Sequence, residues 1–289
     1  MTKYTLIAGA TGGIGCELVR EYAERGYVVF ALAPESELWQ LNPIKSRFAA
    51  VHTFATDIQD ADSIVEAYSQ VRELTTRLDV LFLNAGVCLG GTPGVEFTDV
   101  DLRQSYETNV YGPMYVVRQF IDYVITAKGQ IVFQSSVGSR IPIQWCSIYG
   151  ATSAAIDQYA WGLHSELEPL GVKVHSLITG GVNTGFADPV EVSTLPTHSR
   201  YNVQGMIQSI RDVSNMARVG TMEPEVYARR VLDQLSRRPH RFNIYEGTYS
   251  YRLHLLGRYF PVWITEWIIA AHFQATRVYK NLRSHYGSH

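Results

Sequence analysis

Residues 4–15 read YTLIAGATGGIG, an apolar-rich run of five residues followed by four glycines within seven positions. The run predicts a buried strand, and residues 17–25 after the glycines predict a helix. Gly9 allows a tight turn, Gly13 lets the backbone approach a pyrophosphate, and Gly15 lets the helix pack closely on the strand. Because a helix N-terminus attracts anions, the stretch predicts a strand–loop–helix unit that binds a dinucleotide. We expect six cofactor-binding residues here: Gly9, Thr11, Gly12, Gly13, Ile14 and Gly15.

Short apolar runs alternate with longer amphipathic stretches along much of the remaining chain. The runs that predict strands are 4–8, 28–32, 51–54, 80–83, 130–134, 172–178 and 241–245. The stretches long enough for crossover helices are 13–25, 60–78, 98–124 and 149–170. Several runs are apolar at consecutive positions, which is typical of strands covered on both faces. The pattern predicts an α/β fold, a Rossmann-like doubly wound parallel sheet with helices on both faces.

The composition is that of an ordinary globular protein. With 289 residues, 46% hydrophobic and 18% charged, the chain is neither a disordered protein nor a small disulfide scaffold. A formal net charge of −2 argues against a nucleic-acid partner, because phosphate binding needs a basic surface. We expect one nucleotide-binding and catalytic domain over residues 1–248. Within it, the polar, turn-rich stretch 186–217 predicts a loop that covers the substrate.

The C-terminal end differs in charge from the rest of the chain. Residues 211–289 hold twelve Lys and Arg against six Asp and Glu, whereas residues 1–210 carry a net charge of −8. We expect a basic, aromatic, helical extension over 249–289 that packs on its own domain, on a partner or on an anionic membrane surface. Its apolar core, residues 260–271, is shorter than the roughly twenty residues that span a bilayer.

The three cysteines, Cys16, Cys88 and Cys146, are widely spaced and accompany no clustered histidines, so we expect reduced thiols and no metal site. The N-terminus lacks the apolar segment of a signal peptide. We therefore expect a cytoplasmic protein, with a peripheral position on an internal membrane or lipid droplet as the alternative, and we expect a homo-oligomer.

The Gly-x-x-x-Gly-x-Gly spacing resembles that of the short-chain dehydrogenase/reductase family, and further motifs follow in the family's order. Asn84-Ala85-Gly86 resembles its Asn-Ala-Gly segment, and Tyr149 follows Ser136 by 13 positions, the family's interval between serine and tyrosine. The resemblance implies that Ser136 polarises a carbonyl, Tyr149 donates a proton and Asn109 holds a water in the proton relay. It adds nine cofactor-binding residues: Asp57, Ile58, Asn84, Ala85, Gly86, Ser153, Gly180, Val182 and Thr184.

The family's Tyr-x-x-x-Lys is not complete in this chain. Position 153 is Ser, although residues i and i+4 share a helix face and a lysine there would lie beside Tyr149. In the family, that lysine binds the nicotinamide ribose and lowers the phenol pKa from its usual value of about 10. Ser153 can bind a ribose but supplies no charge. Arg140 is a candidate substitute, and the alternative is a solvated loop arginine.

The choice between dinucleotides rests on two opposing signals. Residues 159–174 and 179–182 resemble the fungal branch that contains 1-acyldihydroxyacetone-phosphate reductase, which implies NADPH-dependent reduction of a lipid-like ketone. Residues 31–35, however, offer neither the acidic residue that binds an NAD ribose nor the arginine that accepts an NADP phosphate. Pro34 stands where related NADP-dependent reductases often carry arginine, and Glu35 and Glu37 would repel a 2′-phosphate if they faced it. We expect NADP(H) rather than NAD(H), with weak or purely structural binding as the alternative.

Three functions remain open at this point. The first is an NAD(P)H-dependent reductase acting on the ketone of a small hydrophobic substrate, either lipid-like or a secondary metabolite. The second is a non-redox cyclase or isomerase on the same scaffold, in which Tyr149 and Ser136 activate a carbonyl while the missing lysine disables hydride transfer. The third is a catalytically silent binding subunit.

Overall fold

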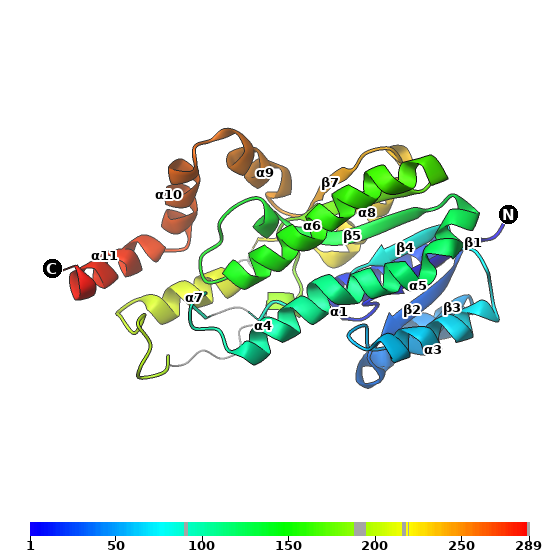
Figure 1. The fold of residues 1–289 in the computed structure, drawn as a ribbon, viewed down its shortest axis with the longest axis horizontal. Helices are drawn as coiled ribbons and strands as arrows, with labels where there is room; N and C mark the ends of the chain where they lie inside the picture. The colour runs from blue at the N-terminus through cyan, green and yellow to red at the C-terminus, as the bar shows by residue number, and fades with distance from the viewer. Residues whose placement is uncertain (90–91, 188–194, 216–217, 219, 288–289) are drawn as a thin grey trace.

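The computed structural model of the chain describes residues 1–89, 92–187, 195–215, 218 and 220–287. One sheet of seven parallel strands has the order β3-β2-β1-β4-β5-β6-β7 (Figure 1). The strands are β1 Lys3–Ala8, β2 Tyr27–Ala33, β3 Val51–Ala55, β4 Val80–Leu83, β5 Gln130–Ser136, β6 Lys173–Thr179 and β7 Asn243–Glu246. All seven strands predicted from the sequence are present, and the expected doubly wound parallel sheet is confirmed.

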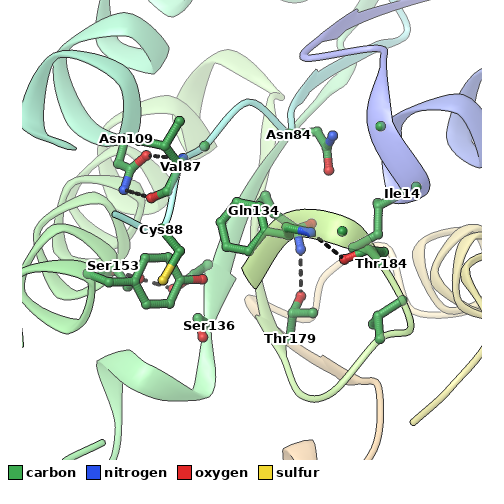
Figure 2. A pocket seen from close by; sticks show the side chains of 18 of the residues that line it. Ile14, Asn84, Val87, Cys88, Asn109, Gln134, Ser136, Ser153, Thr179 and Thr184 are labelled. Atoms are coloured by element: carbon green, nitrogen blue, oxygen red, sulfur yellow. Dashed lines mark hydrogen bonds between the residues drawn. The ribbon is translucent and has the colours of Figure 1, made fainter. Parts of the chain in front are cut away.

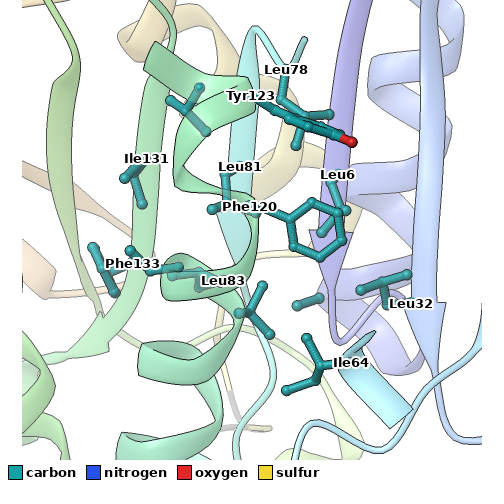
Figure 3. Packing of buried hydrophobic residues seen from close by; sticks show 14 of the residues in the cluster. Leu6, Leu32, Ile64, Leu78, Leu81, Leu83, Phe120, Tyr123, Ile131 and Phe133 are labelled. Atoms are coloured by element: carbon teal, nitrogen blue, oxygen red, sulfur yellow. The ribbon is translucent and has the colours of Figure 1, made fainter. Parts of the chain in front are cut away.

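Helices cover both faces of the sheet. Their bounds are α1 Gly12–Glu24, α2 Asn42–Arg47, α3 Ala61–Arg72, α4 Asp99–Tyr106, α5 Gly112–Ala127, α6 Ser147–Leu167, α7 Met206–Ser214, α8 Pro224–Arg237, α9 Ser250–Tyr259, α10 Val262–His272 and α11 Ala275–Tyr286. Helices α3, α5 and α6 share one buried cluster with the sheet, and α1 and α8 share another. Figure 3 shows Phe120 and Tyr123 of α5 packed against strand residues such as Leu6 and Leu81.

The single helix expected over 98–124 is interrupted. A π-helical turn, Glu107–Tyr111, separates α4 from α5 and contains Asn109. Pro113 explains the interruption, because it has no N–H to donate to the carbonyl of Asn109 four residues earlier. The expected helix over 60–78 also ends sooner, at Arg72.

Part of the expected covering loop, 186–217, is helical. Met206, Ile210 and Val213 recur at helical spacing on α7 and are buried against the C-terminal extension. Residues 188–194, 216 and 217 of that loop lie outside the described residues. The interval between β6 and β7 thus holds two helices, α7 and α8, that the apolar pattern had not indicated.

Residues 249–289 were expected to be helical, and the described part of this extension holds α9, α10 and α11, of which α11 lies beside α7 (Figure 1). Ile269, Ala270 and Phe273 of the extension join a buried cluster with α7 and with residues that follow β5. The hydroxyl of Ser209 on α7 accepts a hydrogen bond from the Trp145 indole at 3.0 Å and donates one to the Phe273 carbonyl at 2.9 Å. One face of the extension therefore packs on its own domain. Among the described helices, none is both long and apolar enough to cross a bilayer.

His175 on β6 should make folding stability depend on pH. Its side chain is fully buried, and Nδ1 donates a hydrogen bond to the Arg241 carbonyl at 2.8 Å while Nε2 has no described partner. Burial lowers the pKa of His175 to about 4. Between pH 6.5 and pH 4, His175 therefore binds a proton in the unfolded chain but stays neutral in the folded protein. We expect the free energy of unfolding to fall by up to about 3 kcal/mol between pH 6.5 and pH 4, measured by urea denaturation. His175→Gln should lower that pH dependence, whereas exposed His285→Gln should retain it; equal slopes in all three proteins would contradict the assignment.

Candidate active site

A cavity of about 1410 Å³ opens at the carboxyl ends of the strands. It extends from the glycine loop between β1 and α1, past the ends of β4, β5 and β6, to the C-terminal helices. Every site residue expected from the sequence lines it: Gly9, Thr11, Gly12, Gly13, Ile14, Gly15, Asp57, Ile58, Asn84, Ala85, Gly86, Asn109, Ser136, Tyr149, Ser153, Gly180, Val182 and Thr184. In parallel α/β sheets, ligands bind at this edge, where the strand order reverses.

The glycine loop is tied directly to the segment that follows β4. Gly9 has a φ of +82°, and a Cβ atom there would lie 2.4 Å from the backbone of Ala85. The Asn84 side chain donates a hydrogen bond to the Gly9 carbonyl at 2.6 Å. At Gly15, a Cβ would lie 2.5 Å from that same carbonyl, so the close packing of helix on strand requires glycine.

At one end of the cavity, the loop after β2 folds back onto the glycine loop. Glu37 lies in a 3₁₀ segment, Glu35–Leu41, and accepts a hydrogen bond from the Thr11 hydroxyl at 2.5 Å. The Gln40 side chain accepts a hydrogen bond from the Gly12 N–H at 3.0 Å. The Asp57 carboxylate accepts one from the Gln59 N–H at 2.9 Å, which shapes the turn that follows β3.

At the other end, three hydroxyl groups converge. The Tyr149 hydroxyl interacts with the hydroxyls of Ser136, at the end of β5, and of Ser153, one turn further along α6, and both interactions favour its ionised form. Ser136 also accepts a hydrogen bond from the Gly138 N–H at 3.1 Å, which fixes its side chain. Figure 2 shows Ser136 and Ser153 on the same side of the cavity. Phe186 packs edge-on against the Tyr149 ring, with ring centroids 5.7 Å apart.

The environment keeps the Tyr149 phenol protonated. Burial raises the pKa of Tyr149 well above its usual value, and the nearby Cys88 thiol raises it further, while the hydrogen bonds from Ser136 and Ser153 oppose these effects. Because the net pKa is raised, the group is a neutral acid at physiological pH. Such a phenol can donate a proton but does not act as a phenolate base.

No cation replaces the missing lysine among the described residues that line the cavity, which include no Lys or Arg. Arg140, the candidate substitute, is not one of them. Its guanidinium pairs with the buried Asp157 carboxylate at 2.6 Å and donates a hydrogen bond to the Asn243 side chain at 3.1 Å. Arg140 is therefore neither a substitute charge nor a solvated loop residue.

Asn109 holds the loop after β4 through its side chain. The amide oxygen accepts from the Val87 N–H at 2.7 Å, and the amide nitrogen donates to the Val87 carbonyl at 2.9 Å (Figure 2). That nitrogen also donates to the Thr152 hydroxyl at 3.0 Å, which joins the loop to α6. Asn109 thus positions the backbone beside Tyr149.

The sequence interpretation missed two groups of cavity residues. Gln134 donates a hydrogen bond to the Thr179 hydroxyl at 2.7 Å, and that hydroxyl lies 2.6 Å from the hydroxyl of Tyr227 (Figure 2 shows the first pair). A glutamine within a buried strand was the available signal. The second group is an apolar wall, for which no local pattern gives a signal because it comes from distant segments: Ile141, Ile143, Val213, Leu253, Ile268, Ile269 and Phe273.

The sequence profile of the short chain dehydrogenase family matches residues 3–193 of this chain. The chain belongs to that family of oxidoreductases. It is 31% identical over 98% of its length to the NADPH-dependent 1-acyldihydroxyacetone phosphate reductase of Saccharomyces cerevisiae, 95% of which is covered.

Two solved structures share the fold of this dehydrogenase. A short-chain dehydrogenase from Streptomyces avermitilis matches with a TM-score of 0.76 and 21% identity, over 98% of this chain and 96% of that one. A short-chain dehydrogenase/reductase from Burkholderia phymatum, in complex with NAD, matches with a TM-score of 0.74 and 22% identity, over 84% and 88%.

The residues present fit a nicotinamide dinucleotide. The glycine loop ends at the N-terminus of α1, where backbone N–H groups and the helix dipole favour a pyrophosphate. Gly180 and Val182 line the same cavity. As for metal ions, the described part of the chain contains no group of three or more His, Cys, Asp or Glu side chains that could hold one.

Restoring a cation should lower the pKa of the Tyr149 phenol. In Ser153→Lys, the ammonium group would lie one helical turn from the phenol and favour the phenolate. The measurement is a pH titration of tyrosinate absorbance, taken as the difference between each protein and its Tyr149→Phe counterpart. We expect no Tyr149 ionisation up to about pH 10 in the wild type and ionisation at least one pH unit lower in Ser153→Lys than in the wild type. Ser165→Lys, exposed on the same helix, is the control; identical titrations in all three would contradict the electrostatic account.

Proposed function

We propose that this short-chain dehydrogenase reduces the ketone of a small hydrophobic molecule, either lipid-like or a secondary metabolite. One observation carries the proposal: Tyr149 and Ser136 line the same cavity as both the glycine loop and an apolar wall. A carbonyl placed beside these two hydroxyls would have a dinucleotide on one side and hydrophobic side chains on the other.

The roles of the residues follow from their contacts. A nicotinamide dinucleotide held by the glycine loop would supply the hydride. Ser136, oriented by the Gly138 N–H, donates a hydrogen bond to the substrate oxygen and polarises the carbonyl. Tyr149 gives its phenolic proton to that oxygen as negative charge develops there. Asn109 keeps the neighbouring loop in place through Val87.

A neutral phenol favours one direction of reaction. Reduction needs an acid, which protonated Tyr149 supplies, whereas oxidation of an alcohol needs the phenolate as a base. Because burial raises the pKa of Tyr149 and the described lining residues include no Lys or Arg, the phenolate is scarce at neutral pH. This supports a reductase and accounts for the tolerance of serine at position 153.

The substrate class follows from the cavity wall. Its apolar part is contributed by α7, α9 and α10 and by residues after β5. Three carboxylates line the cavity, namely Glu37, Asp57 and Asp212, and no described Lys or Arg lines it to bind a phosphate. An uncharged hydrophobic ketone therefore fits better than a phosphorylated one, although the Saccharomyces relative is named for a phosphate ester.

A non-redox cyclase or isomerase is the second candidate. The observation that favours it is the buried, neutral Tyr149 without a neighbouring cation, since proton donation to a carbonyl needs no hydride. In that reaction Tyr149 and Ser136 keep the same roles and the dinucleotide is structural.

The surroundings of the catalytic domain bear on its location. Five large apolar side chains of α9, of α10 and of the link between them are exposed: Tyr259, Phe260, Val262, Trp263 and Trp267. They support contact between the extension over 249–289 and an internal membrane surface or a second copy of the chain. Both contacts, and the cytoplasmic location, stay predictions. NADPH dependence of the Saccharomyces relative is the support for NADP(H) as cofactor.

Turnover of ketones tests the reductase directly. With both NADPH and NADH supplied, we expect oxidation of the dinucleotide with long-chain neutral ketones and little with phosphorylated analogues, followed by nicotinamide absorbance. Tyr149→Phe and Ser136→Ala should each lower kcat/KM by a factor on the order of 10² to 10³. Dinucleotide binding without turnover across the panel would leave the cyclase or isomerase and the catalytically silent subunit. Loss of a product in Tyr149→Phe would then identify the cyclase or isomerase.

Two variants of α10 test the wall. Ile268 lines the cavity, whereas Val262 on the same helix is exposed and does not. Ile268→Ala should raise KM for long-chain ketones by about five- to tenfold, because apolar contact is lost, and should leave short-chain ketones unchanged. Val262→Ala is the matched control and should change neither. Equal KM values for long-chain ketones in wild type and Ile268→Ala would remove α10 from the substrate site.

A further inference from the structure

The cavity carries a carboxylate beside the glycine loop, where the adenosine ribose of a dinucleotide belongs. Glu37 lines the cavity together with Ala33 and Pro34, at the end of β2, and with Asp57, after β3. The reductase's glycine loop forms the other side, through Thr11 and Gly12. In dinucleotide-binding folds, an acidic residue about twenty positions after the glycine motif receives the ribose 2′-hydroxyl. Glu37 follows Gly15 by 22 positions.

Local structure keeps Glu37 in this position. Pro34 precedes the 3₁₀ segment with φ of −55°, and its carbonyl accepts a hydrogen bond from the Glu37 N–H at 2.9 Å. The Glu37 side chain is then held by the Thr11 hydroxyl at 2.5 Å. Because one carboxylate oxygen accepts the hydrogen bond from Thr11, the other remains to accept a hydrogen bond from a ribose hydroxyl.

A 2′-phosphate would meet a different environment. Its charge would lie beside the Glu37 carboxylate, and repulsion between like charges in a partly enclosed site is costly. No Lys or Arg among the described residues lines this end to compensate. The Gly12 N–H, a donor of the kind that binds phosphate, is already taken by the Gln40 side chain at 3.0 Å.

From this arrangement we infer that Glu37 selects NAD(H) over NADP(H). Its carboxylate accepts a hydrogen bond from the ribose 2′-hydroxyl of NAD(H) and repels the 2′-phosphate of NADP(H). The inference rests on the proposed function only in requiring that a dinucleotide binds. It departs from the sequence expectation of NADP(H), which came from resemblance to NADPH-dependent proteins. The reason for the difference is that this chain has Glu37 in the cavity and Pro34 at the position where related NADP-dependent reductases often carry arginine.

Calorimetric titration of the full-length protein with NAD⁺ and NADP⁺, without ketone, tests the inference. We expect NAD⁺ to bind at least about tenfold more tightly than NADP⁺, because the additional phosphate charge is unfavourable beside Glu37. Raising the salt concentration should narrow this difference by screening the repulsion. NADP⁺ binding as tightly as NAD⁺, or more tightly, would overturn the inference.

Three variants assign the preference to Glu37. Glu37→Gln keeps the shape but removes the charge and should bring the two affinities within about threefold. Glu37→Arg should reverse the preference, because a guanidinium pairs with a phosphate. Glu35→Gln alters an exposed acid of the same segment that does not line the cavity, and it should keep the wild-type ratio. A ratio that moves equally in Glu35→Gln and Glu37→Gln would exclude a specific role for Glu37.

The outcomes separate the two proposals. If the folded wild type, verified by its thermal unfolding, binds neither dinucleotide, both the role of Glu37 and the reductase proposal are wrong. Tight NAD⁺ binding without ketone turnover would sustain the role of Glu37 and defeat only the reductase. Should Glu37→Arg unfold, Glu37→Gln still decides the matter, since its amide has nearly the same size and can still accept the Thr11 hydrogen bond.

Discussion

The site depends first on the close approach of two backbone segments, the turn at Gly9 and the segment at Ala85. A side chain at Gly9 would collide with Ala85, and the Asn84 amide holds the Gly9 carbonyl at 2.6 Å. Their strands, β1 and β4, are neighbours in the sheet, but α1 and α5 pack on opposite faces. The connections therefore leave the sheet in opposite directions and open a cleft between them.

Within that cleft, the described lining residues include no Lys or Arg, and this lack of positive charge affects both ends of the site. At one end, Tyr149 stays a neutral acid because burial raises its pKa and no ammonium group stabilises the phenolate. At the other end, Glu37 faces the place of the adenosine ribose without a compensating cation. This chain lacks the family lysine but keeps the hydroxyl groups of Tyr149 and Ser136, which can transfer a proton and polarise a carbonyl. The described lining of the cavity offers no Lys or Arg to bind a phosphate ester.

The parts of this fold that could be predicted are those with local causes. Strand β1 is apolar at consecutive positions because both of its faces are buried, and the glycines after it are required by close contacts near their own backbone. The break at Asn109 also had a local cause, Pro113, which the amphipathic pattern concealed. The apolar wall was not predictable, because Ile269 and Phe273 reach the cavity only after α10 has packed on α7.

The sequence by itself determined the fold class, the family and the residues gathered at the cavity, because strand periodicity and motif spacing are written in local order. It also determined that position 153 has no charge. Only the tertiary structure decided that Arg140 forms an ion pair with Asp157, that Glu37 accepts a hydrogen bond from Thr11, and that the C-terminal extension forms a wall of the cavity. Each of these depends on contacts between residues far apart in the chain, whose partners are set by how the helices pack and not by the residues beside them.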